Sequence, residues 1–138
     1  MIYRKFGNKY ILRIDKGEEI LQNLKEFCIM KNIKLGIVSG IGAVNKLIIG
    51  YFETGTRQYQ QREFVGNYEI ASLIGNISTM NDEVYFHVHI SLSDSTYNTF
   101  GGHLNSATVS STCEVVIDVM DGEFRRTYDK GIGLNLLK

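Results

Sequence analysis

Two segments of the chain alternate between apolar and polar residues, and this pattern constrains the fold more than any other feature. Within Val84–Leu92 and Ala107–Val119, apolar side chains mostly occupy every second position. Because successive side chains of a β-strand point to opposite faces, each segment has one apolar and one polar face. Such strands suit an antiparallel sheet that packs one face against a helix.

One segment has the spacing of an amphipathic helix. Its apolar face is formed by Ile20, Leu21, Leu24, Phe27 and Cys28. Asp15 precedes this segment and Glu18 follows three residues later, a capping-box pattern that predicts a helix capped by Asp15. We expect this helix to end near Asn32 and to follow a strand at Tyr10–Ile14.

The remaining sequence contains no proline, so its fourteen glycines supply most of the turn signals. The segment 35–52 is apolar but interrupted by glycines, which inside strands often mark a bulge or a close backbone approach. Further predicted elements are strands at Arg57–Val65 and Tyr68–Thr79 and turns at Gly66-Asn67 and Asn81-Asp82. Strands outnumber helices without alternating with them, so we predict a single α+β domain over residues 1–138, mainly antiparallel sheet packed with one main helix.

The charge balance limits the classes of partner. Fifteen basic and fifteen acidic side chains give a formal net charge of zero. DNA-binding domains usually carry an excess of Lys and Arg, which replaces the counterions of phosphate groups, and this chain has none. A net charge near zero also does little to keep copies apart, so it is compatible with self-association.

Cysteine usage and hydropathy indicate a cytoplasmic protein. Cys28 and Cys113 lie in apolar patterns, which favours two buried free thiols, although a disulfide between them remains an alternative. The first residues lack the apolar run of a signal peptide. No segment approaches the ~18 uninterrupted apolar residues of a membrane span, so we expect no membrane insertion.

All three histidines of the chain fall in one short window. His87 and His89 are two residues apart on a predicted strand, so they project together, ~6–7 Å apart, on the face opposite the apolar one. His103 follows Gly101-Gly102, a pair that permits a tight turn to bring this ring over the other two. Three converging imidazoles can hold Zn²⁺ and leave one coordination position open.

Two interpretations of the histidines remain open: a metal site, or polar side chains on a solvated or interface face of the sheet. Zinc is the default divalent metal, but nickel, cobalt and iron accept the same ligand type. Carboxylates that could orient a ligand ring or act as a general base are Asp82, Glu83 and Asp94 nearby in sequence, and Glu69 in the preceding strand. Arg13, within an apolar strand, is either an anion-binding residue beside the site or a snorkelling edge residue.

Several blocks of the chain, taken in order, resemble the plants-and-prokaryotes-conserved (PPC) domain, a domain of unknown function. The blocks are Arg13–Ile20, Gly36–Val44, Tyr68–Ile77, His87–Asp94, Gly101–Leu104 and Cys113–Ile117. The resemblance implies an α+β fold and a homotrimer. It also implies that His87, His89 and His103 belong to one metal site.

Relatives of this domain are often labelled DNA-binding, because plant members join it to an AT-hook. This chain has no Arg-Gly-Arg-Pro core, and after Gly66 it carries Asn67 and Tyr68 where the plant-type segment has Arg and Phe. The resemblance therefore does not extend to direct DNA binding.

Three functions follow, in order of preference. The first is a trimeric metal-binding module that acts as a regulator or sensor of a small molecule or anion. The second is a metal-dependent, zinc-type hydrolytic enzyme that uses the three-histidine site and a metal-bound water. The third is a DNA-associated architectural protein, against which the neutral composition counts.

Overall fold

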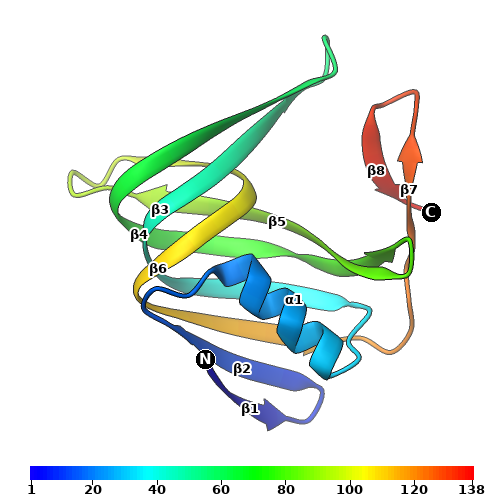
Figure 1. Cartoon of the computed structure of the whole chain (residues 1–138), viewed down its shortest axis with the longest axis horizontal. Helices are drawn as coiled ribbons and strands as arrows, with labels where there is room; N and C mark the ends of the chain where they lie inside the picture. Colours follow the sequence, from blue (N-terminus) through cyan, green and yellow to red (C-terminus); the bar gives the residue numbers. More distant parts are fainter.

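A curved, six-stranded antiparallel sheet forms the body of the molecule (Figure 1). The structure is a computed structural model that describes residues 1–138. The sheet order is β1-β2-β6-β3-β4-β5. The strands are β1 (Ile2–Phe6), β2 (Lys9–Asp15), β3 (Gly36–Glu53), β4 (Gln58–Met80), β5 (Glu83–Ser93) and β6 (Thr99–Val119). With its one helix, this architecture confirms the predicted α+β class.

Strand β6 closes the sheet on itself. Its C-terminal part, Thr112–Asp118, pairs with β2, and residues between His103 and Val119 pair with β3. Its first residues, Thr99–His103, pair with β5 at the other end of the strand order. The additional pairing closes β6, β3, β4 and β5 into a ring, with β1 and β2 outside it, and His103 lies where β6 meets β5.

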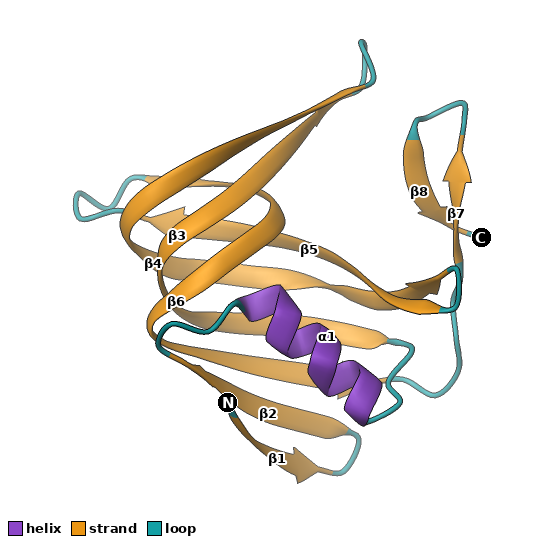
Figure 2. Cartoon of the chain, viewed as in Figure 1, coloured by secondary structure: helices purple, strands orange, loops and turns teal.

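Helix α1 (Ile20–Met30) packs against one face of the sheet (Figure 2). The expected apolar face is confirmed, because Ile20, Leu24, Phe27 and Cys28 are buried among the strand residues of the core. The inward-facing strand residues include Val88, Ile90, Leu92, Val115 and Ile117. Since alternate residues of these strands face the core, the intervening residues form an outer face that no helix covers.

The predicted helix start is wrong by four residues. The N-cap is Glu19, whose side chain accepts a hydrogen bond from the Gln22 amide at 2.6 Å. Asp15 ends β2 instead, and its amide donates to the Glu18 carboxylate at 2.7 Å. Gly17, with φ of +87°, turns the chain between these residues, so the side-chain bond of Glu18 closes a strand-to-helix turn rather than a helix N-terminus.

The two thiols are buried and free, as expected. Neither Cys28 nor Cys113 forms a disulfide. Burial raises the pKa of each thiol to about 12, because a thiolate would lose its hydration in the core. Both cysteines therefore act as small apolar core residues.

The Gly66-Asn67 turn predicted from sequence is a bulge within one continuous strand. Val44 pairs with Tyr68 and Lys46 pairs with Val65, so three steps along β4 match two along β3. The extra residue is absorbed where Gly66 has φ of +149°. The two predicted strands on either side of it are accordingly one strand, β4. By contrast, the Asn81-Asp82 turn is confirmed, and both of its residues have positive φ, as tight hairpins require.

Gly101-Gly102 is also not a turn. Both glycines lie inside β6, where Gly101 pairs with Ser91 and Gly102 with Ile90. A Cβ atom on Gly101 would lie 2.2 Å from the Ile90 carbonyl oxygen, so a larger residue does not fit between the strands. The chain reverses earlier, in the segment 94–98 between β5 and β6. The glycines thus permit close strand pairing, and this pairing brings His103 back.

A small hairpin stands beside the sheet near the C-terminal end. It consists of β7 (Arg126–Asp129) and β8 (Leu134–Leu137), drawn at the red end of the colour range in Figure 1. An isolated bridge between Thr79 and Arg125 connects it to the end of β4.

Helix α1 is too short and not apolar enough to cross a bilayer.

Replacing Gly101 tests the close strand approach. We expect Gly101→Ala to lower the free energy of unfolding by about 2 kcal/mol or more, because its methyl group would overlap the Ile90 carbonyl group. Urea denaturation followed by circular dichroism measures the change. The control is Gly55→Ala, whose Cβ would meet nothing closer than 3.5 Å. Equal stability of the two variants would contradict the close approach.

Candidate metal centre

The three histidines meet on the outer face of the sheet. Their ring centroids are 5.2 Å apart for His87 and His89, 5.3 Å for His87 and His103, and 5.6 Å for His89 and His103. One donor nitrogen from each ring lies within 4.8 Å of the other two. The meeting of the three rings expected from sequence is therefore present.

Backbone pairing fixes this arrangement. His87 and His89 are alternate residues of β5, so they share a face. His103 lies directly opposite His89 in the β5–β6 register, and opposite residues of an antiparallel pair also share a face. The sheet itself, rather than a flexible loop, supplies all three rings.

The donor set fits a divalent transition metal. Tetrahedral zinc with Zn–N bonds of ~2.0–2.1 Å places its nitrogen ligands ~3.4 Å apart. Starting from separations within 4.8 Å, small rotations of the imidazole rings reach this spacing without moving the strands. Three ligands from one protein surface also leave a coordination position free, as in catalytic rather than structural zinc sites.

The local environment keeps two of the rings neutral. Burial lowers the pKa of His103 to about 4, and the neighbouring His87 and His89 add to this effect. Burial also lowers the pKa of His87, with further contributions from the positive charge of Arg126 and from His89. Because neutral imidazole is the form that binds metals, both rings are ready to act as ligands at neutral pH.

No carboxylate belongs to the histidine group. Asp94 accepts hydrogen bonds from the Thr96 and Asn98 amides, which fix the reversal between β5 and β6. Asp82 lies 3.5 Å from Arg125, and Glu83 lies 3.1 Å from Lys25.

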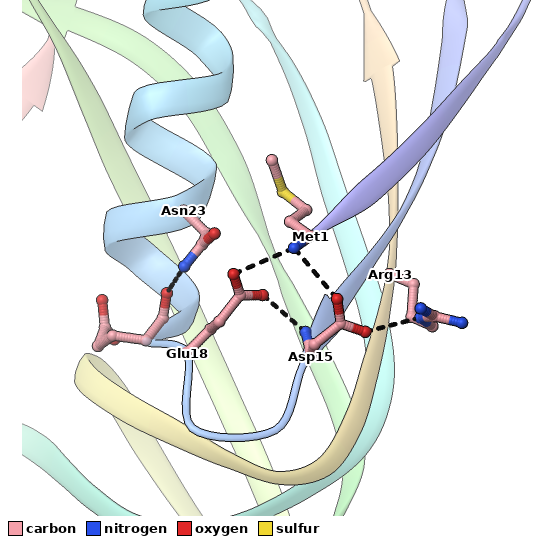
Figure 3. Close-up of polar contacts among 6 residues, drawn as sticks. Met1, Arg13, Asp15, Glu18 and Asn23 are labelled. Carbon is pink, nitrogen blue, oxygen red and sulfur yellow. Dashed lines mark hydrogen bonds and ion pairs between the residues drawn. The ribbon is translucent and has the colours of Figure 1, made fainter.

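The other two candidates from sequence lie elsewhere as well. Glu69 is exposed and pairs in register with Ser93, four residues beyond His89 along β5. Arg13 donates to Asp15 at 2.8 Å, beside the Met1 ammonium group that lies 3.1 Å from the same carboxylate (Figure 3). The structure therefore places Arg13 in a charge cluster at the end of β2, and it does not bring Glu69, Asp94 or Arg13 into the histidine group.

Arg126 is a site residue that the sequence did not reveal. It belongs to β7, yet only 7% of its surface is exposed. Its guanidinium donates to Ser78 Oγ at 2.8 Å and to Asn76 Oδ1 at 2.8 Å. Asn76 is the direct partner of His87 in the β4–β5 register, so this guanidinium lies beside the histidines. In the sequence Arg126 follows another arginine in a polar segment, and no local pattern distinguishes the two.

Tyr59 is a second residue that sequence reasoning missed. Its ring lies edge-on to His103, with a centroid distance of 6.1 Å. Its hydroxyl group donates to Asn105 Oδ1, and its ring occupies the space that a side chain on Gly50 would need. Tyr59 thus packs against His103 from the long hairpin formed by β3 and β4.

Sequence comparison assigns the chain to a known family. The sequence profile of the Plants and Prokaryotes Conserved domain, abbreviated PPC above and also PCC, matches residues 1–121. The chain belongs to this family. The matched segment contains His87, His89 and His103, whereas Arg126 lies beyond it.

Two solved structures and one curated protein are similar to this chain. A protein of Bacteroides thetaiotaomicron, to which DNA binding is provisionally assigned, is 39% identical, with a TM-score of 0.96 over 99% of this chain and 96% of its own. A metal-containing protein of Archaeoglobus fulgidus is 33% identical, with a TM-score of 0.90 over 100% of this chain and 99% of its own. The bifunctional protein GlmU of Synechococcus is 28% identical over 127 residues, which are 90% of this chain but only 19% of that protein.

The lowered pKa of His103 predicts a pH-dependent stability of the metal-free protein. The unfolded imidazole takes up a proton near pH 6.5, whereas the folded one does so only near pH 4. The stability from this residue is thus fully present above pH 6.5 and lost as the pH falls to 4. We expect a loss of about 1–2 kcal/mol, because solvent screens the half-buried ring.

Urea denaturation in the presence of EDTA, at several pH values between 7 and 4, measures this loss. The His103→Gln variant removes the titrating group and should show a correspondingly flatter dependence. An identical pH dependence in the two proteins would show that the ring is not shielded from protons.

Proposed function

We propose that this PCC-domain protein is a metal-binding module whose ligands are His87, His89 and His103. The observation that carries the proposal is the convergence of three imidazole donors within 4.8 Å of one another. The lowered pKa values of His87 and His103 support it, since protons compete weakly for these ligands at neutral pH. The metal-containing relative from Archaeoglobus fulgidus, similar over its whole length, adds further support.

Zinc is the metal that we assign, because imidazole nitrogens suit it and its preferred geometry tolerates an open position. Three neutral ligands leave the ion its full charge, so it would supply Lewis acidity at the open position. A small molecule or anion that reaches this position would change the charge balance of the outer face. We therefore propose a regulatory or ligand-sensing role.

Hydrolysis by a metal-bound water is the second candidate function. The open coordination position favours it, because three-histidine zinc sites can generate a nucleophilic hydroxide. The histidine group nevertheless contains no carboxylate that could act as a general base. We rank binding above catalysis for this reason.

Direct DNA binding is not part of the proposal. The provisional assignment belongs to the protein from Bacteroides thetaiotaomicron. In this chain, basic and acidic side chains are equal in number, so the net charge offers no electrostatic attraction to phosphate groups.

We further propose that the protein assembles as a homotrimer through the outer face of its sheet. On this face, one row of successive cross-strand partners consists of Ile11, Val116, Ser39, Ile74, His89 and His103. Ile11, Ile74 and the neighbouring Ile37 and Ile41 are exposed in the single chain. Large apolar side chains gathered on one face usually mark an interface, and a copy packed here would place the histidines at a subunit boundary.

Zinc content tests the ligand assignment. We expect about one zinc ion per chain after loading and dialysis, measured by elemental analysis. His103→Ala should lower the zinc affinity by about 100-fold or more, because losing a direct ligand costs more than losing the outer-shell partner of one. The control is Glu69→Gln, an exposed residue outside the group, which should retain zinc. Full zinc content in the His103→Ala variant would refute the metal site.

Light scattering coupled to size-exclusion chromatography tests the assembly. We expect a trimer for the unmodified chain and smaller species for Ile74→Asp, since an interface would bury the added charge without a partner. The matched control is Ile29→Asp on the outer side of helix α1. Ile29 is exposed to a similar degree, 61% against 56% for Ile74, but lies in the opposite layer. A monomer for the unmodified chain, or a trimer for Ile74→Asp, would exclude assembly through this face.

A further inference from the structure

Arg126 carries a buried positive charge without a negative partner. Only 7% of the residue is exposed, and no carboxylate lies within ion-pair distance of its guanidinium. Its hydrogen bonds go to neutral acceptors: Ser78 Oγ, Asn76 Oδ1 and, at 2.9 Å, the Asn135 carbonyl oxygen. Buried charges in proteins are normally paired, so we expect an anion from outside the chain to pair with this guanidinium.

The guanidinium lies at the edge of the histidine group. Asn76, which accepts its Nη2 hydrogen bond, is the cross-strand partner of His87. Tyr85 lies two residues before His87 on the same face of β5, and its ring centroid is 5.1 Å from the Arg126 guanidinium carbon. The charge of Arg126 also helps to lower the pKa of His87, which agrees with this proximity.

We propose that Arg126 and the metal at the histidines together form a binding site for a small oxyanion, a carboxylate or phosphate group. This inference rests on the metal-binding function proposed above. A divalent ion beside Arg126 would add to a positive charge that the chain itself leaves unbalanced, and one oxyanion between them would balance both. Carboxylate and phosphate oxygens match the planar donors of a guanidinium.

The guanidinium is held ready for such a ligand. Three of its five N–H groups are used by Ser78, Asn76 and Asn135, which leaves one donor on each terminal nitrogen. The same three bonds, together with the Tyr85 ring, fix its orientation before any ligand binds. A donor fixed in this way loses little conformational entropy on binding, which favours affinity.

An anion titration of the cobalt-loaded full chain tests the inference. Cobalt(II) replaces zinc, and its visible absorption bands shift when an anion enters its coordination sphere. The probes are sodium acetate and inorganic phosphate, titrated separately into the unmodified chain and into the Arg126→Gln variant. We expect the variant to bind the preferred probe at least about tenfold more weakly, because it loses a buried charged donor. The probe with the larger loss identifies the ligand as carboxylate or phosphate.

Two controls separate anion binding from anchoring of the β7–β8 hairpin. Thr79→Val removes the hydrogen bond that Thr79 Oγ1 donates to Glu123, just before the hairpin, but no contact of Arg126, so it should leave the anion affinity within about twofold. Arg125→Gln removes the neighbouring, exposed arginine and should have no effect on it. A loss in Thr79→Val as large as in Arg126→Gln would show that Arg126 only anchors the hairpin, and would overturn the inference.

The outcomes also distinguish this inference from the proposed function. Failure of the unmodified chain to bind cobalt would refute the metal site itself. Cobalt binding with anion affinities that are equal in the unmodified chain and Arg126→Gln would refute the role of Arg126 alone. Should Arg126→Gln not fold, Arg126→Lys decides the matter: it keeps the charge but loses the planar donor pair, so a several-fold weaker affinity is expected and an unchanged affinity contradicts the proposal.

Discussion

Backbone pairing of β6 with three other strands is the constraint on which both the fold and the histidine group depend. β6 pairs with β2 along its C-terminal part, with β3 along most of its length and with β5 at its beginning, so β3, β4, β5 and β6 close into a ring. The paired backbones approach one another closely. At three glycines a Cβ atom would lie only 2.2–2.3 Å from a carbonyl oxygen of the adjacent strand; these are Gly42, Gly75 and Gly101. His103 faces His89 through the same pairing. The hydrogen bonds that hold the sheet together therefore also preorganise the three rings.

The electrostatics of the outer face follow from this geometry. Burial and neighbouring positive charge lower the pKa values of His87 and His103. The apo protein thus keeps neutral donors next to the fixed charge of Arg126. An arrangement that disfavours protons while presenting lone pairs is suited to a cation that binds through nitrogen, and the nearby guanidinium then favours an anionic co-ligand.

Local sequence patterns predicted the strands and the hairpin turn that depend on neighbouring residues alone. Alternation gave the strands around His87 and Val115, and the left-handed preference of Asn81-Asp82 gave a hairpin turn. Glycine dipeptides were ambiguous because the same residues serve turns, bulges and close strand crossings, and only the neighbouring strands decide among these. Gly101-Gly102 therefore looked like a turn, although it lies inside a strand. Arg126 could not be found at all, since its side-chain acceptors on β4 are 48 and 50 residues away in sequence.

The residues of the proposed site come from two parts of the chain. The three histidines lie within residues 1–121, which match the PCC domain, whereas Arg126 lies in the hairpin that follows. That hairpin contacts the sheet mainly at the end of β4, so its sequence is less constrained by the core than the strands are. In the anion site that we propose, a substitution at Arg126 would change the anion-binding residue without altering the three histidines. In this chain the sheet would therefore hold the metal, and the C-terminal hairpin would contribute the charge that selects its anion.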